Sequence, residues 1–309
     1  MSDSLKEKFE VIRKCFYRAG YYTIHHDGIE HAGYLAFLGM LSFFPFLVFF
    51  IAIAALIGEV KLGEEFLNVV IEKLPEDMIG ALKPRIVEII EGPPQGLLTI
   101  AIIGAIWTAS SAVEGLRTVL NRAYRVKTPP SYLWRRMLSI AQFLALTAII
   151  IVAMSLIIFV PPFWHQIERI TGLVVVLEPI INNFGYLISS FIIFLVIAIS
   201  YYVLPNIKQN RRAVVPGALV TLILWVGAAE LLSGYIENFE QVNIVYGSLG
   251  GIIVALLFFY VISVIYIFGA EFNYFYESAM GVKFVEKEKV TAKKSGPKKI
   301  SLKKKKRKK

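Results

Sequence analysis

The chain has 309 residues, of which 56% are apolar and only 18% are charged. Soluble domains average about 45–50% apolar and about 25% charged residues, so this composition excludes an ordinary soluble protein. The net charge of +10 does not indicate a nucleic-acid-binding fold, because 14 Lys and Arg lie within residues 283–309 and the rest of the chain is close to neutral.

The N-terminal segment, residues 1–31, is mixed in polarity, and we expect it to be cytoplasmic. It contains His25, His26, Asp27 and His31, which could bind a metal if their donor atoms converged. The spacing favours polar side chains at the edge of a membrane span instead, and we predict neither a metal site nor a cofactor. The single cysteine, Cys15, excludes an internal disulfide framework.

Long stretches without Lys or Arg dominate the rest of the chain. A helix that crosses the hydrocarbon core of a bilayer needs about 20 mostly apolar residues. Six stretches meet or approach this length, and they define a membrane domain over residues 32–275. They run over residues 32–57, 97–113, 138–160, 184–204, 214–236 and 249–275. We therefore predict an all-α, polytopic membrane helix bundle with six transmembrane helices.

The distribution of positive charge orients this bundle. Cytoplasmic loops of membrane proteins carry an excess of Lys and Arg. With six spans, 28 of the 33 Lys and Arg fall on the side that holds both termini, and the excess persists when the C-terminal tail is left out. We therefore expect the N- and C-termini to be cytoplasmic.

Two further segments flank the spans. Residues 58–96 form a connection that is long for a simple loop, and its apolar residues recur at helical spacing. We predict an outer-face helical loop, which either caps the bundle or forms a lid over an outward-facing cavity. Residues 276–309 form a basic tail that we expect to be disordered and to contact anionic lipid, rather than a specific nucleic acid.

Ionisable side chains near membrane spans are energetically costly and therefore mark candidate functional sites. Such residues gather at the cytoplasmic ends of the second and sixth spans. We expect Glu114 or Glu271 to pair with Arg117 or Arg122, and the pairing could be structural or could couple to a proton or substrate. The candidate polar cluster consists of Glu114, Arg117, Asn121, Arg122, Glu271 and Asn273.

Motifs of soluble enzymes are not found. The sequence offers no Ser/His/Asp or Cys/His set and no glycine-rich loop followed by the lysine that binds phosphate. We therefore predict that the protein is not an enzyme.

Several short motifs carry a family resemblance. They are Leu204-Pro205-Asn206, Val215-Pro216-Gly217-Ala218, Tyr246-Gly247-Ser248-Leu249-Gly250 and Gly269-Ala270-Glu271. In this order they resemble the YihY/virulence factor BrkB family, over about residues 15–277. The resemblance implies a prokaryotic inner-membrane protein with six spans. Some members carried the label ribonuclease BN, and others are linked to serum resistance or to the handling of envelope lipids.

Three hypotheses about function follow. The leading one is transport or translocation of a small amphipathic or lipid-related substrate across the plasma membrane. The alternative is a non-transporting membrane scaffold or envelope-interaction protein that binds its partners through the outer loop and the tail. A ribonuclease is the least supported, because the residues for that chemistry are missing from the sequence.

Overall fold

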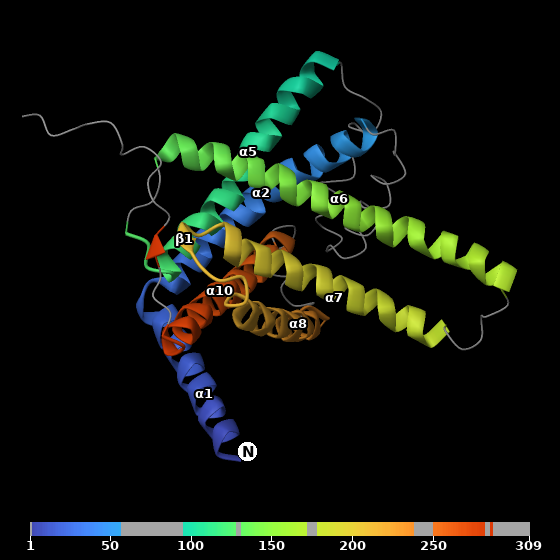
Figure 1. Cartoon of the computed structure of the whole chain (residues 1–309). Coiled ribbons are helices and arrows are strands. Elements are labelled where there is room, and N and C mark those ends of the chain that lie inside the picture. The colour runs from blue at the N-terminus through green and yellow to red at the C-terminus, as the bar shows by residue number, and fades with distance from the viewer. Residues whose placement is uncertain are drawn as a thin grey trace, which may run out of the picture.

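The computed structural model describes residues 2–56, 95–127, 131–171, 178–237, 250–281 and 285–286. Almost all of these residues are helical, and Figure 1 shows the helices fanning out from one side of the molecule. The helices are α1 (Ser2–His25), α2 (Gly28–Leu56), α5 (Gln95–Ala123), α6 (Tyr132–Thr171), α7 (Glu178–Val203), α8 (Val215–Glu237) and α10 (Gly250–Ala279). Two short strands, β1 (Ile207–Lys208) and β2 (Val285–Glu286), complete the described elements.

The predicted all-α class is confirmed, and each of the six predicted spans falls on one helix, from α2 to α10. Within the described residues, three segments have both the length and the apolar composition to cross a membrane. They are Tyr132–Val152, Val215–Leu232 and Gly250–Ala279, and a shorter apolar helix runs over Ser190–Val203. Residues 57–94, which hold nearly all of the predicted outer loop, and the tail after residue 286 lie outside the described residues.

The N-terminal segment forms a separate helix, α1, which meets α2 at a sharp corner. Asp27 has a φ of 56°, in the left-handed region, and His26 N donates a hydrogen bond to Tyr22 O at 3.0 Å just before it. A left-handed residue commonly ends a helix in this way. Beyond the corner, Cys15 and Ala19 of α1 are buried against Phe272 of α10. Helix α1 is therefore docked on the bundle.

Helix α10 lies at the centre, where it packs against α1, α2, α5 and α8. Its approach to α8 depends on two glycines. A Cβ atom on Gly269 would lie 2.5 Å from Tyr201 Oη and would also collide with Thr221 Oγ1, and one on Gly217 would collide with Gly269 O. Small residues at such contacts let helix backbones approach closely, which drives helix packing in lipid.

The C-terminal part of the described chain is also ordered. Helix α10 continues to Ala279, past the start of the predicted tail at residue 276, and β2 pairs antiparallel with β1. In this pairing Ile207 lies opposite Glu286 and Lys208 lies opposite Val285. The connection between α7 and α8 is thereby joined to the segment that follows α10.

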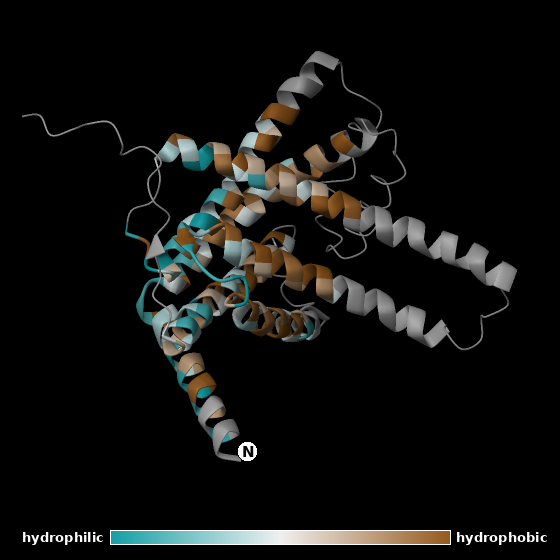
Figure 2. Cartoon of the chain, in the orientation of Figure 1, coloured by the Kyte–Doolittle hydropathy of each residue, from teal (hydrophilic) through white to brown (hydrophobic). Residues whose placement is uncertain are grey.

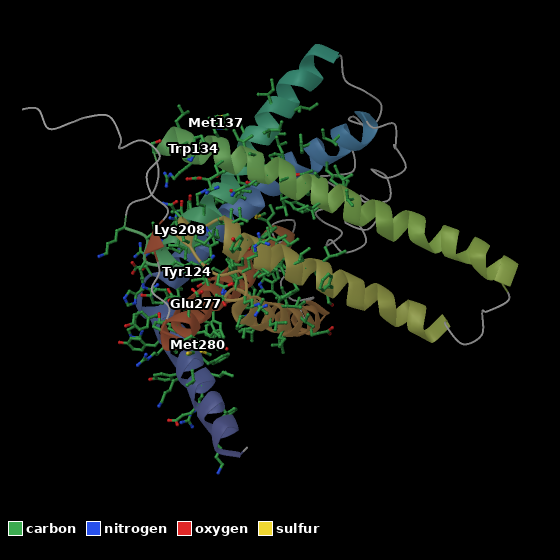
Figure 3. The ribbon with its side chains drawn as sticks, in the orientation of Figure 1. Tyr124, Trp134, Met137, Lys208, Glu277 and Met280 are labelled. Carbon is green, nitrogen blue, oxygen red and sulfur yellow. The ribbon has the colours of Figure 1, made fainter. Side chains whose placement is uncertain are left out.

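Polar residues concentrate on one side of the molecule. Figure 2 shows the hydrophilic residues near β1, the start of α6 and the corner between α1 and α2, whereas the coloured parts of the helices that lead away from this side are mostly hydrophobic. Tyr124, Lys208 and Glu277 lie on this same side in Figure 3. We call this side the polar end of the bundle.

Candidate functional site

An apolar cavity of about 450 Å³, partly open to the outside, lies between the helices. All six helices that correspond to predicted spans contribute to its lining, and most of the lining side chains are aliphatic. Representative lining residues are Leu35 of α2, Leu116 of α5, Leu146 of α6, Val196 of α7, Trp225 of α8 and Phe259 of α10. The volume falls in the usual range of ligand sites, about 300–1,000 Å³.

The few polar groups in the cavity wall are largely occupied by the protein itself. Ser200 Oγ donates to Ile197 O at 2.7 Å and lies 2.7 Å from the Tyr266 hydroxyl. Trp225 Nε1 donates to Ile262 O at 3.0 Å. Because these groups are already hydrogen-bonded, they offer little to a polar solute. The cavity is therefore suited to a hydrocarbon chain.

A buried ionic group adjoins the cavity through Arg117 of α5, which is only 3% exposed. Its guanidinium donates to Leu204 O at 3.3 Å and to Gln142 Oε1, and both of these residues line the cavity. Arg117 Nε lies 3.4 Å from Glu114 Oε2, and Ser139 Oγ donates to that same oxygen at 2.7 Å. The expected pairing of Glu114 with Arg117 is thus present.

Two arginines at the start of α6 extend this group. Arg135 Nε lies 3.4 Å from the second oxygen of Glu114. Arg136 is 5% exposed, stacks 4.1 Å above the Trp107 ring and donates to Ser111 Oγ at 3.1 Å. Both arginines are among the predicted cytoplasmic charges but not among the six residues of the candidate polar cluster. Their adjacency at the start of an apolar stretch is the signal that could have identified them.

Glu271 has a different partner from the one predicted. Its two carboxylate oxygens accept hydrogen bonds from Arg125 Nη1 at 2.7 Å and Nη2 at 2.8 Å, so of the alternative pairings expected, the one that forms is that of Glu114 with Arg117. The reason lies in the end of α5, where Arg125 has a φ of 59° and turns back towards α10. Arg122 pairs instead with Asp27 at the corner between α1 and α2.

The two asparagines of the candidate cluster, Asn121 and Asn273, connect chain segments at the polar end of the bundle. Asn121 Oδ1 accepts a hydrogen bond from Asn206 N at 2.7 Å, which joins α5 to the chain after α7. Asn273 is 1% exposed, accepts from Gly217 N at 2.7 Å and donates to Val214 O at 3.3 Å. These bonds tie α10 to the start of α8. The six predicted residues therefore do not form one cluster: only Glu114 and Arg117 contact each other, and this pair adjoins the cavity.

The histidine-rich segment shows ring stacking. His25 stacks on Tyr21 with ring centroids 4.0 Å apart, and His26 stacks on Tyr22 at 4.5 Å. Within the described residues, no three His, Cys, Asp or Glu side chains come together in a way that could hold a metal ion. Glu230, the acid of the fifth predicted span, is exposed.

Comparison with known proteins identifies the class. Residues 23–294 match the family described as virulence factor BrkB, and the chain belongs to this family. It is 30% identical over 256 residues to the ribonuclease-like protein YfkH of Bacillus subtilis (strain 168), a match that covers 82% of this chain and 90% of that relative.

A second relative carries a membrane designation. The chain is 22% identical over 247 residues to a UPF0761 membrane protein of Alteromonas mediterranea, which covers 78% of this chain and 80% of the relative. No solved structure matches the chain. The family and the apolar helices together make this chain an integral membrane protein.

Proposed function

We propose that this protein translocates a small amphipathic, lipid-related substrate across the prokaryotic plasma membrane, with the hydrocarbon part of the substrate in the apolar cavity. The observation that carries the proposal is the composition of the cavity wall, which all six helices build from mostly aliphatic side chains. A hydrophilic solute would lose its hydration there without gaining hydrogen bonds. A hydrocarbon chain makes no hydrogen bonds with water, so it would enter the cavity without this cost.

The proposal includes a topology of six spans with both termini in the cytoplasm. Contacts at the polar end support it. Arg122 reaches Asp27 before α2, Arg125 reaches Glu271 near the end of α10, and Asn121 contacts the chain after α7. Residues 1–31, 114–137 and 205–213, which hold 14 of the 19 Lys and Arg that precede residue 283, are thus joined on one side of the bundle, as the positive-inside rule requires of a cytoplasmic face.

A substitution that fills the cavity tests the proposal. Ala145 of α6 lines the cavity and Ala148, on the same helix, does not, although both residues are exposed. In proteoliposomes, Ala145→Trp should slow the movement of a fluorescent phospholipid between leaflets, measured by its accessibility to dithionite. Ala148→Trp should leave the rate unchanged. Equal rates in wild type, both variants and protein-free vesicles would refute translocation through this cavity.

We also propose that the protein is not an enzyme, although one relative is described as ribonuclease-like. The cavity wall is apolar, and hydrolysis of RNA needs polar groups around a highly charged backbone. Purified protein should leave a labelled RNA intact with and without divalent cations. Cleavage that persists through purification and disappears with a substitution in this chain would favour the enzyme instead.

A further inference from the structure

The arginines beside the cavity outnumber the acids that could balance them. Arg117, Arg135 and Arg136 surround the α5–α6 crossing, and Glu114 is the one carboxylate that contacts them within the described residues. The group therefore carries two more positive than negative charges. Burying a charge without a partner is costly, so an excess of this kind is stable only with a counter-ion or another strong acceptor.

Hydrogen-bond donors in this group also remain unused. Neither Arg135 Nε nor Arg136 Nε, both buried atoms, has a hydrogen-bond acceptor among the described residues. Arg135 Nε forms an ion pair with Glu114 Oε1 at 3.4 Å, but neither atom makes a hydrogen bond, and Arg136 Nε has no carboxylate beside it in the described part of the chain. Buried polar groups are normally satisfied, and two orphan guanidinium donors in one place indicate an acceptor that binds there.

The position of the arginines along α6 matches the level of lipid headgroups. Tyr132 and Trp134, which precede them, are 62% and 59% exposed, and Figure 3 shows Trp134 and Met137 at the start of α6. Exposed Tyr and Trp side chains of membrane helices concentrate at the membrane–water interface. Gln142 and Leu146, further along the same helix, line the apolar cavity.

From these observations we propose that Arg117, Arg135 and Arg136 form a binding site for the anionic headgroup, a phosphate or carboxylate, of the substrate whose hydrocarbon chain occupies the cavity. This inference rests on the proposed function and adds the charge of the substrate. Arg117 joins the two parts of the site, because its guanidinium contacts Glu114 on one side and the cavity residues Gln142 and Leu204 on the other. Arg135, the more exposed of the cations, is the first to meet an incoming headgroup.

A binding experiment on the full chain tests the headgroup. Purified protein in detergent is titrated with phosphatidylglycerol and with phosphatidylcholine of identical acyl chains, and bound lipid is counted by native mass spectrometry. Wild type should prefer the anionic lipid by about tenfold, as expected for one or two charge-assisted hydrogen bonds. The variant Arg135→Gln/Arg136→Gln should lose this preference while its affinity for phosphatidylcholine stays the same.

The chain provides a matched control for the loss of two adjacent cations. Arg211 and Arg212 are exposed residues between β1 and α8. Arg211→Gln/Arg212→Gln removes the same charge and should keep the preference. Because Arg136 is buried and its loss could disturb folding, the single variant Arg135→Gln serves as a second test, with an expected drop in preference of at least threefold.

The possible outcomes separate the two proposals. Equal binding of both lipids by wild type, or an unchanged preference in the arginine variants, overturns the headgroup site and leaves translocation of a hydrocarbon-bearing substrate in place. Absence of bound lipid overturns both. Competition by glycerol phosphate at the concentration of the lipid itself would assign the site to a free anion and overturn its link to the cavity, whereas competition only at a large excess supports it.

Discussion

The ion pair between Arg125 and Glu271 allows a quantitative prediction about stability. The pair is bidentate, and the side chain of Glu271 is only 5% exposed, whereas that of Arg125 is 29% exposed. Arg125→Met keeps a long apolar stem but leaves the Glu271 carboxylate buried without its cation. Loss of one partner from a buried pair costs about 3–5 kcal/mol. Because Arg125 is partly exposed, we expect a loss near the lower limit, about 3 kcal/mol.

The backbone of Arg125 adds a second part to this prediction. Val126 N donates to Asn121 O at 2.8 Å and Arg125 N donates to Arg122 O at 3.0 Å, so α5 ends in a motif that usually places glycine at the left-handed position. The φ of 59° costs a residue with a side chain about 1–2 kcal/mol. Arg125→Gly removes the same cation but relieves this strain. It should therefore be about 1 kcal/mol less destabilised than Arg125→Met.

The assay is reversible denaturant unfolding in detergent micelles, followed by tryptophan fluorescence. The double variant Arg125→Met/Glu271→Leu should recover most of the loss, because no buried charge remains. Lys14→Met is the control, since Lys14 and Glu10 form an exposed pair at 2.8 Å whose loss should have little effect on stability. The reasoning fails if Arg125→Met costs no more than Lys14→Met, or if the double variant loses the sum of the two single effects.

Two further predictions concern helix packing. Gly269→Ala should destabilise the contact between α8 and α10 by about 1–3 kcal/mol, because the added Cβ would collide with Thr221 Oγ1. Gly227→Ala is the control: the same assay should show almost no effect, because a Cβ atom at Gly227 has open space around it. Burial raises the pKa of the Cys15 thiol, which lowers its thiolate fraction near neutral pH. N-ethylmaleimide should therefore label native protein slowly, and Phe272→Ala, which removes a packing partner of Cys15, should speed the labelling at least fivefold; an equal rate would mean that α1 is not docked on α10.

Several features of the bundle could be predicted from the sequence alone. Helix type and approximate bounds follow from uninterrupted apolar runs, which are a local property, and all six predicted spans fall on helices. The concentration of Lys and Arg in particular loops is also a local property, so it too can be read from the sequence alone. The candidate residues at the ends of the second and sixth spans were predicted in the same way, because a charge beside an apolar run is visible without a structure.

The pairing of Glu114 with Arg117 was among those expected, but the partner of Glu271 could not be predicted in this way. Glu271 pairs with Arg125 and not with Arg117 or Arg122, because the left-handed turn after α5 reverses the chain towards α10. Helical periodicity does not extend through such a turn. The left-handed conformation of Arg125 therefore brings its guanidinium to Glu271, a pairing that the sequence pattern does not predict.

The cavity and the arginines beside it depend entirely on tertiary structure. The lining comes from helices separated by up to about two hundred residues, and Arg136 reaches Trp107 and Ser111 only because α6 crosses α5 at this level. The composition determined that the protein would be helical and membrane-embedded, because long apolar segments are stable in lipid and satisfy their backbone hydrogen bonds there by forming helices. Which side chains meet was decided by how the helices cross, because contacts between distant segments depend on the packing of whole helices.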